Sequence, residues 1–448
     1  MHTDPAHTHF LRLAEHVDRR LRPGEDHTLW LQGEDSDFVR FNRGRVRQPG
    51  SVRQDELSLR LIQDQRHAAV DLTLSGQLAD DQARLDAALE RLRARLAELP
   101  EDPHLLWATE GESTTRIAEG ESPDGRVIAD LVLEEAARDG GVDLVGILVS
   151  GQMYAGFASS RGQRCWDQRH SWLLDWSLVH QGDKAVKSTF GGTDWQPEAL
   201  RARLQQARAD LPVLARPARR LEPGAYRAWL SPAALAEVVD LLAWGAFSHR
   251  SQEARNTPLL RLMTGEEHLD PRVTLVEDVA RGLAPAFTPD GFTRPAQVPL
   301  IDAGLLVGSL ISPRSSREYG RPHNGAASDE SPTSLSLAPG SLPDADVLRA
   351  LGTGLFISNL WYLNYSDRAA GRMTGMTRFA TTWVQDGEVV APTEVMRFDE
   401  TIFHLLGEGL IAIGADAAML PGTSTYERRS TTSSRLPGVL VEGMRFTL

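Results

Sequence analysis

Cysteine and lysine are nearly absent from this chain of 448 residues. Cys165 is the only cysteine, so no disulfide can form within the chain, and a reducing compartment would suit it. A lone cysteine in an extended run is expected to be a small buried apolar residue and not a nucleophile. Lys184 and Lys187 are the only lysines, so arginine carries almost all of the positive charge.

Positive charge is also outnumbered, because the formal net charge is -13 at pH 7. An acidic surface disfavours nucleic acid and anionic membranes as partners, since binding to phosphate requires a basic face. No stretch approaches the ~20 uninterrupted apolar residues of a transmembrane helix. The N-terminus shows no basic segment followed by an apolar one, as a secretory signal would. We therefore expect a cytoplasmic protein with no nucleic acid and no membrane as partner.

The length exceeds what one ordinary hydrophobic core accommodates, so two or more domains are expected. The stretch from Pro212 to Gly224 contains three prolines and three arginines, a composition typical of a linker. We predict an N-terminal domain over residues 1–215 and a C-terminal domain over residues 222–448.

Alternating apolar and polar residues dominate the first part of the chain. Runs such as 28–32 and 37–42 approximate period two and have glycine between them, which predicts short antiparallel strands with one solvated face. Further strand-like runs cover residues 45–48, 56–62, 68–74, 143–150, 153–158, 164–170 and 171–180. Apolar spacing predicts helices over 10–21, 78–99, 127–138 and 197–211. The N-terminal domain is thus predicted to be an α/β domain with an antiparallel sheet and helices.

The second part of the chain begins with a helix and continues as short strands. Ser231 and Pro232 supply an N-cap and a proline at the first helical position, and the apolar spacing extends this helix to Phe247. The remainder is rich in glycine and proline with short alternating runs, which predicts a barrel-like, mostly antiparallel β domain. Residues 315–343 are polar and are expected to form a functional or mobile loop. The fold class is therefore predicted to be α+β.

Residue patterns for familiar hydrolytic chemistry are missing. Zinc catalysis needs about three protein ligands and a nearby base, but the sequence contains no His-Glu dipeptide. His249 and His268 lie too far apart to share a ligand motif. His2, His7 and His9 cluster at a terminus that we expect to be frayed, which makes a metal site there a remote alternative. No G-x-S-x-G nucleophile motif occurs either.

Several short segments occur in the order found in a known family. These are Phe38-Val-Arg-Phe-Asn-Arg-Gly-Arg-Val-Arg-Gln, residues 57–66, Trp244-Gly-Ala-Phe-Ser-His, Val273-Thr-Leu-Val-Glu-Asp, residues 299–310, 372–379 and 384–392. Together they resemble the TldD/PmbA (TldE) family of metallopeptidase-related proteins over about residues 35–448. Each segment is a short strand with a glycine turn, so their order along the chain carries the resemblance.

The resemblance also shows what this chain lacks. TldD-type members carry H-E-x-x-x-H, with two zinc-binding histidines and a catalytic glutamate. If His249 matches the second histidine, then Trp244 stands at the first histidine and Gly245 at the glutamate. The family's third ligand is a cysteine near the C-terminus, and the comparable stretch 420–426 has none. The resemblance therefore implies a TldE/PmbA-like member without a zinc site and without catalytic residues.

An aromatic segment in the second half has two interpretations. Trp361, Tyr362 and Tyr365, with Arg372 downstream, are candidates for a peptide groove or a subunit contact. The alternative is a strand whose alternating apolar residues belong to the core, followed by solvated arginines.

The resemblance implies a non-catalytic subunit of a TldD/TldE-type zinc metallopeptidase complex. A TldD-like catalytic subunit would then supply the zinc, this chain would hold no cofactor, and the heterodimer would enclose unfolded peptide substrate. One alternative is a homodimer that binds peptides or small molecules without cleaving them. Another is an independent enzyme that uses Asp278, Asp302 and the loop 315–334.

Overall fold

The computed structural model describes residues 4–118, 123–138, 141–181 and 184–447. Its first half contains α1 (Pro5–Asp18), β1 (Glu25–Asn42), β2 (Arg45–Gln63), β3 (Arg66–Thr73), α2 (Leu78–Leu96), β4 (Thr115–Ile117), α3 (Gly125–Ala137), β5 (Asp143–Ser159), β6 (Arg164–Gln181), β7 (Lys184–Gly192) and α4 (Pro197–Leu214). The strands form one sheet in the order β3-β2-β1-β5-β6-β4, with β7 also paired to β6. The pairing is antiparallel except between β4 and β6.

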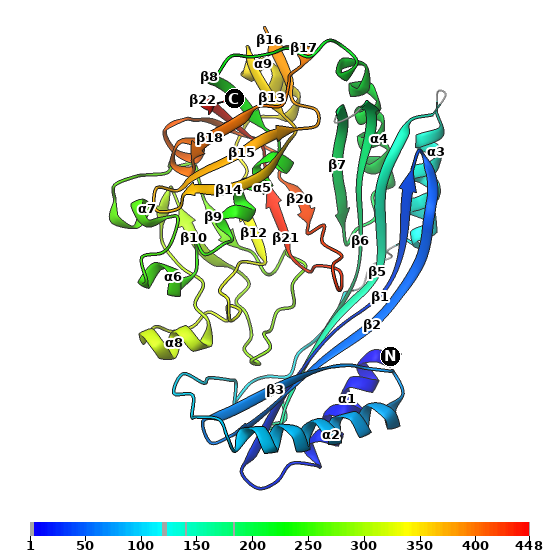
Figure 1. Cartoon of the computed structure of the whole chain (residues 1–448), viewed down its shortest axis with the longest axis vertical. Helices are drawn as coiled ribbons and strands as arrows, with labels where there is room; N and C mark the ends of the chain where they lie inside the picture. The colour runs from blue at the N-terminus through cyan, green and yellow to red at the C-terminus, as the bar shows by residue number, and fades with distance from the viewer. Residues whose placement is uncertain (1–3, 119–122, 139–140, 182–183, 448) are drawn as a thin grey trace.

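Four of these strands are much longer than predicted and run along most of the length of the molecule (Figure 1). The predicted breaks near Gly33 and Gly151 were wrong, because both residues lie inside continuous strands. A Cβ atom at Gly33 would lie 2.2 Å from the Tyr154 ring, and one at Gly151 would lie 2.2 Å from the Asp35 carbonyl oxygen. Glycine therefore marks close approaches between strands here and does not mark turns.

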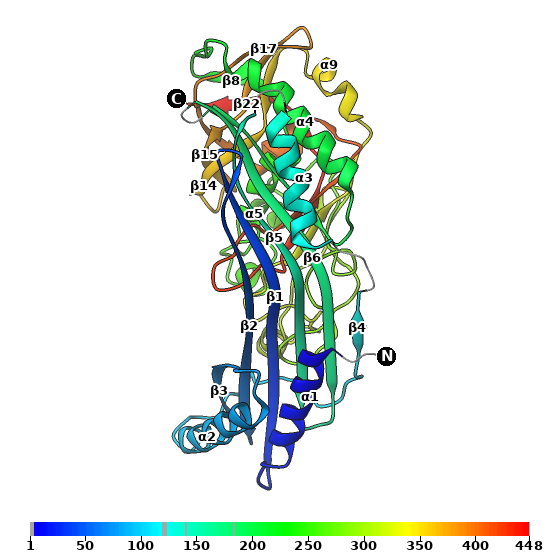
Figure 2. The same cartoon turned by 90° about the vertical axis from the view of Figure 1, so that its right-hand side faces the viewer.

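The helices cover one face of this sheet at its two ends (Figures 1 and 2). Helices α1 and α2 pack on one end, where Leu29 and Leu31 of β1 join their core. Helices α3 and α4 pack on the other end, where Val39 and Phe41 of the same strand join a second core. These four strand residues share one parity and so one face. The opposite face, which carries Trp30, Glu34 and Ser36 of β1, contacts the second half of the chain.

The second half contains β8 (Gly224–Leu230), α5 (Pro232–Leu242), α6 (His249–Glu253), α7 (Leu260–Thr264), β9 (Leu275–Glu277), β10 (Val298–Asp302), β11 (Leu305–Leu306), α8 (Pro313–Tyr319), β12 (Ser334–Leu337), η2 (Asp344–Asp346), α9 (Val347–Leu351), β13 (Gly354–Ile357), β14 (Asn359–Asp367), β15 (Arg372–Arg378), β16 (Thr382–Gln385), β17 (Glu388–Pro392), β18 (Arg397–Thr401), η3 (His404–Glu408), β19 (Leu410–Ile413), β20 (Ala418–Pro421), β21 (Ser433–Leu436) and β22 (Val439–Phe446). One sheet has the order β11-β10-β9-β12-β21-β20. The other has the order β14-β15-β18-β22-β8-β13-β16-β17, with β19 on β22. Most pairs are antiparallel, and the α+β class with a curled, β-rich second half is confirmed.

Every described strand before Gly192 belongs to the first sheet, and every one after Gly224 belongs to the other two. The strands of the two predicted domains thus belong to different sheets. The exact position of the domain boundary stays a prediction. The predicted linker was wrong at its start, because α4 continues through Pro212 to Leu214. Helix α4 contacts both β7 and β17, so it joins the two halves.

Three other expectations need correction. The helix that starts at Ser231 is capped as predicted, with the Ser231 hydroxyl accepting from the Ala234 amide, but it ends at Leu242 and not at Phe247. Residues 315–343 are not a plain loop, because they contain the end of α8 and all of β12. The N-terminal histidines are not frayed: the His7 ring stacks on Trp166 at 4.6 Å, while His2 lies outside the described residues. In the part of the chain that is described, no helix is long and apolar enough to cross a bilayer.

Candidate functional site

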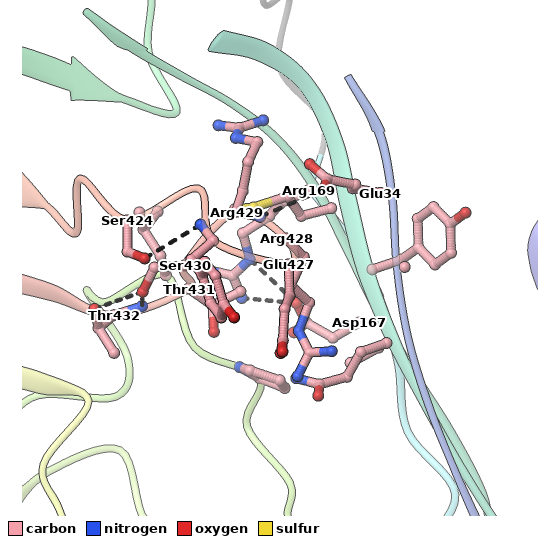
Figure 3. A pocket seen from close by; sticks show the side chains of 18 residues that line it. Glu34, Asp167, Arg169, Ser424, Glu427, Arg428, Arg429, Ser430, Thr431 and Thr432 are labelled. Carbon is pink, nitrogen blue, oxygen red and sulfur yellow. Dashed lines mark hydrogen bonds and ion pairs between the residues drawn. The ribbon is translucent and has the colours of Figure 1, made fainter. Parts of the chain in front are cut away.

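The loop from Gly422 to Thr432 joins β20 to β21 and reaches the long strands of the first sheet (Figure 3). A cavity of about 280 Å³ lies between this loop and strands β1, β5 and β6. A second cavity of about 180 Å³ lies on the other side of the same loop, against α5. Thr432 lines both, so the loop forms the wall between them.

Arg429 fastens the loop to the first sheet. Its side chain is buried and donates to the Ser171 hydroxyl at 2.8 Å, the Ser171 carbonyl at 3.0 Å and the Gly151 carbonyl at 3.3 Å. Its backbone amide donates to the buried Glu34 carboxylate at 3.4 Å. Burial lowers the pKa of Arg429 to about 10, and the nearby Glu34 charge partly opposes this. The guanidinium thus stays charged near neutral pH and holds the two halves of the chain together.

Most of the other charged side chains around the first cavity are also paired, and the exception among the described residues is the exposed Glu427. Arg169 and Arg116 donate to the two oxygens of the Asp167 carboxylate, at 2.8 Å and 2.6 Å. Arg428 is bound to Glu56 of β2. Because these charges compensate one another, the first cavity offers a ligand little uncompensated charge.

The second cavity has a different character. Glu237 and Asp240 of α5 line it from one side, and Lys187 of β7 lines it from another. The two carboxylates are three residues apart and therefore lie on the same side of the helix. Neither has a hydrogen bond or an ion pair with any residue in the described ranges. The Lys187 ammonium is engaged elsewhere, with both oxygens of Asp175 at 2.6 Å and 2.7 Å.

These surroundings perturb the protonation of both carboxyl groups. Asp240 is an exposed residue at the edge of the cavity, and the desolvation caused by the protein packed near its carboxyl group raises the pKa of Asp240 to about 6. Burial also raises the pKa of Glu237; the negative charge of Asp240 adds to that effect, and Lys187 opposes it. Perturbed carboxyl groups inside a cavity are a recognised indication of a functional site.

A third polar group completes this cavity. Asn359, the first residue of β14, lines it and is only 8% exposed. Its Oδ1 atom has no hydrogen-bond partner among the described residues. This oxygen is buried against protein and is not open to the cavity, so its missing hydrogen bond costs free energy, on the order of 1–3 kcal/mol.

The structure separates the three degenerate zinc-motif positions from this cavity. Trp244 is 60% exposed, and Gly245 has a positive φ of 87° in the turn that follows α5. His249 begins the short helix α6, and it is buried, with its ring edge-on to Tyr319 at 5.5 Å. None of the three lines the second cavity. The positions do not lie on one helix, because α5 stops before them.

The residues just before the zinc-motif positions do meet the cysteine-free stretch at the second cavity. Asp240 and Ala243 come from the first region, and residues 420–423 come from the stretch that lacks the cysteine. The lining side chains there include no histidine and no cysteine. Within the described ranges, no group of three or more His, Cys, Asp or Glu side chains is placed to hold a metal ion. This donor set does not fit a catalytic zinc, so no step through zinc is assigned to it.

The predicted groove residues differ in exposure. Trp361 is 45% exposed and Tyr362 is 76% exposed, with their rings 5.6 Å apart. Tyr362 has a positive φ of 60°, at an irregularity in the pairing of β14 with β15. Tyr365 instead donates its hydroxyl to the Leu241 carbonyl at 2.9 Å, and Arg372 lies 3.8 Å from Asp399. Only the first pair is therefore open to a partner or a peptide.

Two other residues that the sequence analysis considered, Cys165 and Asp278, lie in environments that explain them structurally. Cys165 is free and buried, as predicted. Asp278 is buried, and its Oδ2 accepts from the Arg281 guanidinium at 2.6 Å, so its charge is already compensated.

Comparison with known proteins identifies the family. The family model of the PmbA/TldA metallopeptidase C-terminal domain matches residues 223–448. The chain belongs to the TldD/PmbA family. No curated protein sequence matches this TldD/PmbA member significantly.

Solved structures share the fold of this TldD/PmbA member along almost its whole length. TldE from Thermococcus kodakarensis is 12% identical with a TM-score of 0.78, and the match covers 98% of this chain and 100% of that one. A proposed modulator of a DNA gyrase from Thermotoga maritima is 15% identical with a TM-score of 0.74, covering 98% and 99%. A proposed modulator of DNA gyrase from Bacteroides thetaiotaomicron is 15% identical with a TM-score of 0.72, covering all of both chains.

Sequence reasoning missed Glu237, Asn359 and the role of Arg429. Glu237 and Asp240 lie opposite the apolar face of α5, where acidic residues are ordinarily solvated. Only the packing of residues 420–434 and β14 near that helix makes these exposed side chains part of a cavity wall. No local signal distinguishes Arg429 from the adjacent Arg428, although one is buried and the other is half-buried.

Proposed function

We propose that this chain is the non-catalytic, TldE-like subunit of a zinc metallopeptidase complex that acts on unfolded peptides in the cytoplasm. The zinc and the catalytic glutamate are supplied by a TldD-like partner, and this chain contributes substrate positioning. The observation that carries the proposal is the second cavity. It lies between the end of α5 and residues 420–423, offers no histidine or cysteine ligand, and yet carries the carboxylates of Glu237 and Asp240 without a partner among the described residues.

Without a bound metal, nothing in this cavity lowers the pKa of a water molecule to near neutrality. Its carboxylates can instead attract and orient a positively charged or hydrogen-bond-donating group. The exposed pair Trp361 and Tyr362 lies on β14, which is an edge strand of its sheet. An edge strand with aromatic side chains suits contact with an extended peptide or with the partner subunit.

A second candidate is a homodimer that binds peptides or small molecules without cleaving them. The same cavity supports it, because unpaired acceptors can serve binding alone. The two candidates differ in whether a zinc-bearing partner gains activity from this chain.

The test compares peptide hydrolysis by three samples: this chain, a TldD-like protein with H-E-x-x-x-H from the same genome, and their mixture. We expect no hydrolysis and no stoichiometric zinc in this chain alone, and a higher rate in the mixture than in the partner alone. Trp361→Ala should reduce the gain on mixing, while Val127→Ala, an exposed apolar residue on α3, should not. Chelator-sensitive hydrolysis by this chain alone, or about one bound zinc per chain, would contradict the proposal. An unchanged rate on mixing would favour the homodimer.

A further inference from the structure

We propose that the turn between β1 and β2 binds an acidic segment of a partner protein through four arginines. These are Arg40, Arg43, Arg45 and Arg47, together called the arginine hairpin. The inference goes beyond the proposed function, because it concerns neither hydrolysis nor either of the two cavities.

The arginine hairpin is strongly basic within an acidic chain. Residues 38–54 contain five arginines and no acidic residue, although the formal net charge of the whole chain is -13 at pH 7. All four side chains of the hairpin are exposed. None of them has a hydrogen bond, an ion pair or a ring contact with any residue that the structure describes. Their positive charge is therefore available to a partner.

The acidic residues that flank the hairpin in the sequence are engaged with other groups. Asp37, the last one before it, accepts from the Ser51 hydroxyl at 2.5 Å. Asp55, the first one after it, accepts from the Tyr154 hydroxyl at 2.6 Å. Helix α3 lies beside the hairpin, and its last two acidic residues pair with Arg138. None of these carboxylates neutralises the arginine hairpin by an ion pair.

The chain presents these arginines on a fixed turn. Asn42 pairs with Arg45, which leaves a two-residue turn of Arg43 and Gly44, and both of these residues have a positive φ, 53° and 64°. This is the backbone of a type I′ turn, in which asparagine followed by glycine is preferred. The Gly44 amide donates to the Leu144 carbonyl at 3.0 Å and ties the turn to β5. A long side chain with positive φ is uncommon, so folding alone does not explain an arginine at position 43.

The size and the place of the patch favour a short acidic segment over a nucleic acid. The turn lies beside α3, on the side of the molecule away from β14 and β15 (Figure 1). All four arginines lie within three residues of the turn, which is about 10 Å of strand. Guanidinium groups bind carboxylates with two parallel hydrogen bonds, so a few glutamates or aspartates can cover this patch. A nucleic acid would extend beyond it, onto the acidic remainder of the chain, which repels phosphates.

The first experiment uses a fluorescein-labelled peptide in which six glutamates alternate with glycine, and measures its binding to the full chain by fluorescence anisotropy at pH 7.5. The neutral match has glutamine in place of every glutamate. We expect saturable binding of the glutamate peptide only, and weaker binding as the salt concentration rises, because salt screens exposed charges. Arg40→Gln combined with Arg45→Gln should weaken this binding by about tenfold. Arg91→Gln combined with Arg95→Gln, which removes two exposed arginines of α2, should leave it unchanged.

The second experiment separates binding from folding with Arg43→Asn. Asparagine tolerates a positive φ and is preferred at this position of a type I′ turn. The variant should therefore unfold at the same temperature as the parent chain or at a higher one, and yet bind the glutamate peptide several-fold more weakly. A lower unfolding temperature with unchanged binding would mean that Arg43 serves the fold and would contradict its role in the hairpin.

The third probe is a fluorescein-labelled thymidine oligonucleotide with six phosphates. We expect it to bind more weakly than the glutamate peptide. Tighter binding of the oligonucleotide, lost in the Arg40 and Arg45 double variant, would assign the hairpin to nucleic acid and overturn the proposal. Equal binding of the glutamate and glutamine peptides, or binding that survives the double substitution, would overturn it as well. None of these measurements depends on peptide hydrolysis, so failure of this inference is distinguishable from failure of the proposed function.

Discussion

The two cavities on either side of the loop 422–432 share a wall and differ in how their charges are satisfied. Around the first cavity, Arg429, Arg169 and Asp167 are bound to protein groups. In the second cavity, Glu237, Asp240 and the Oδ1 of Asn359 have no partner in the described ranges. Paired buried charges fix one part of a structure to another, whereas the exposed carboxylates of Glu237 and Asp240 are not used to hold the chain together. The charged groups at the first cavity therefore hold the two halves of the chain together, and those at the second cavity do not.

Replacing the central fastening group should give the largest effect on stability. Arg429→Ala removes a buried cation whose guanidinium donates to four protein oxygens, among them the Ser171 and Gly151 carbonyls. We expect the free energy of unfolding to fall by about 3 kcal/mol, measured by urea denaturation. The neighbouring Arg428→Ala is the matched control. Its half-exposed pair with Glu56 should cost less than about 1 kcal/mol. Equal losses of unfolding free energy in the two variants would show that Arg429 does not fasten the loop more strongly than Arg428.

Replacing a carboxylate of the second cavity should have the opposite and smaller effect. The pKa of Asp240 is raised to about 6 by burial, above its ordinary value of 3.8. The folded chain therefore binds this proton more tightly than the unfolded chain, and stability falls as the pH rises through this range. Asp240→Asn should stabilise the chain above pH 6 by about 1 kcal/mol, a figure reduced because the side chain is accessible from the cavity.

The stability difference between Asp240→Asn and the parent chain should depend on pH. Below pH 4 both forms of the chain carry a neutral group at position 240, so the two denaturation curves should coincide. The neighbouring Glu237, whose pKa is also raised, and the Lys187–Asp175 pair are unchanged in the variant and serve as the common background. A variant that is less stable than the parent chain at pH 7.5 would mean that Asp240 has a stabilising partner, and the contrast between the cavities would fail.

Local patterns predicted much of the fold because they depend on neighbouring residues. The Ser231 cap, the helices and the parity of the strands follow from such signals. The long strands were predicted as fragments because Gly33 and Gly151 look like turn residues, while their real role is to let Tyr154 and the Asp35 backbone come close. That contact joins residues far apart in the sequence, so no local pattern contains it.

The candidate site was less predictable for the same reason. The family resemblance linked residues 420–426 with the zinc-motif positions Trp244, Gly245 and His249, and in the structure residues 420–423 line the second cavity together with Asp240 and Ala243, which precede those positions. The sequence analysis singled out Trp244, Gly245 and His249. These residues do not line that cavity, because α5 ends before them. The interpretation of the aromatic segment stayed open until the exposure of Trp361 and Tyr362 was known. Enclosure depends on tertiary packing, which residue spacing does not report.

The most direct test of the central claim is a steady-state kinetic measurement on the mixture with a TldD-like partner. The claim is that this chain positions substrate and leaves the chemistry to its partner. With a peptide that carries a free amine, Asp240→Asn should raise KM by about tenfold and leave kcat unchanged, and Asp130→Asn should change neither. With an acetylated peptide without lysine, the variant and the parent chain should behave alike. A fall in kcat at constant KM would place Asp240 in the chemical step and contradict the account.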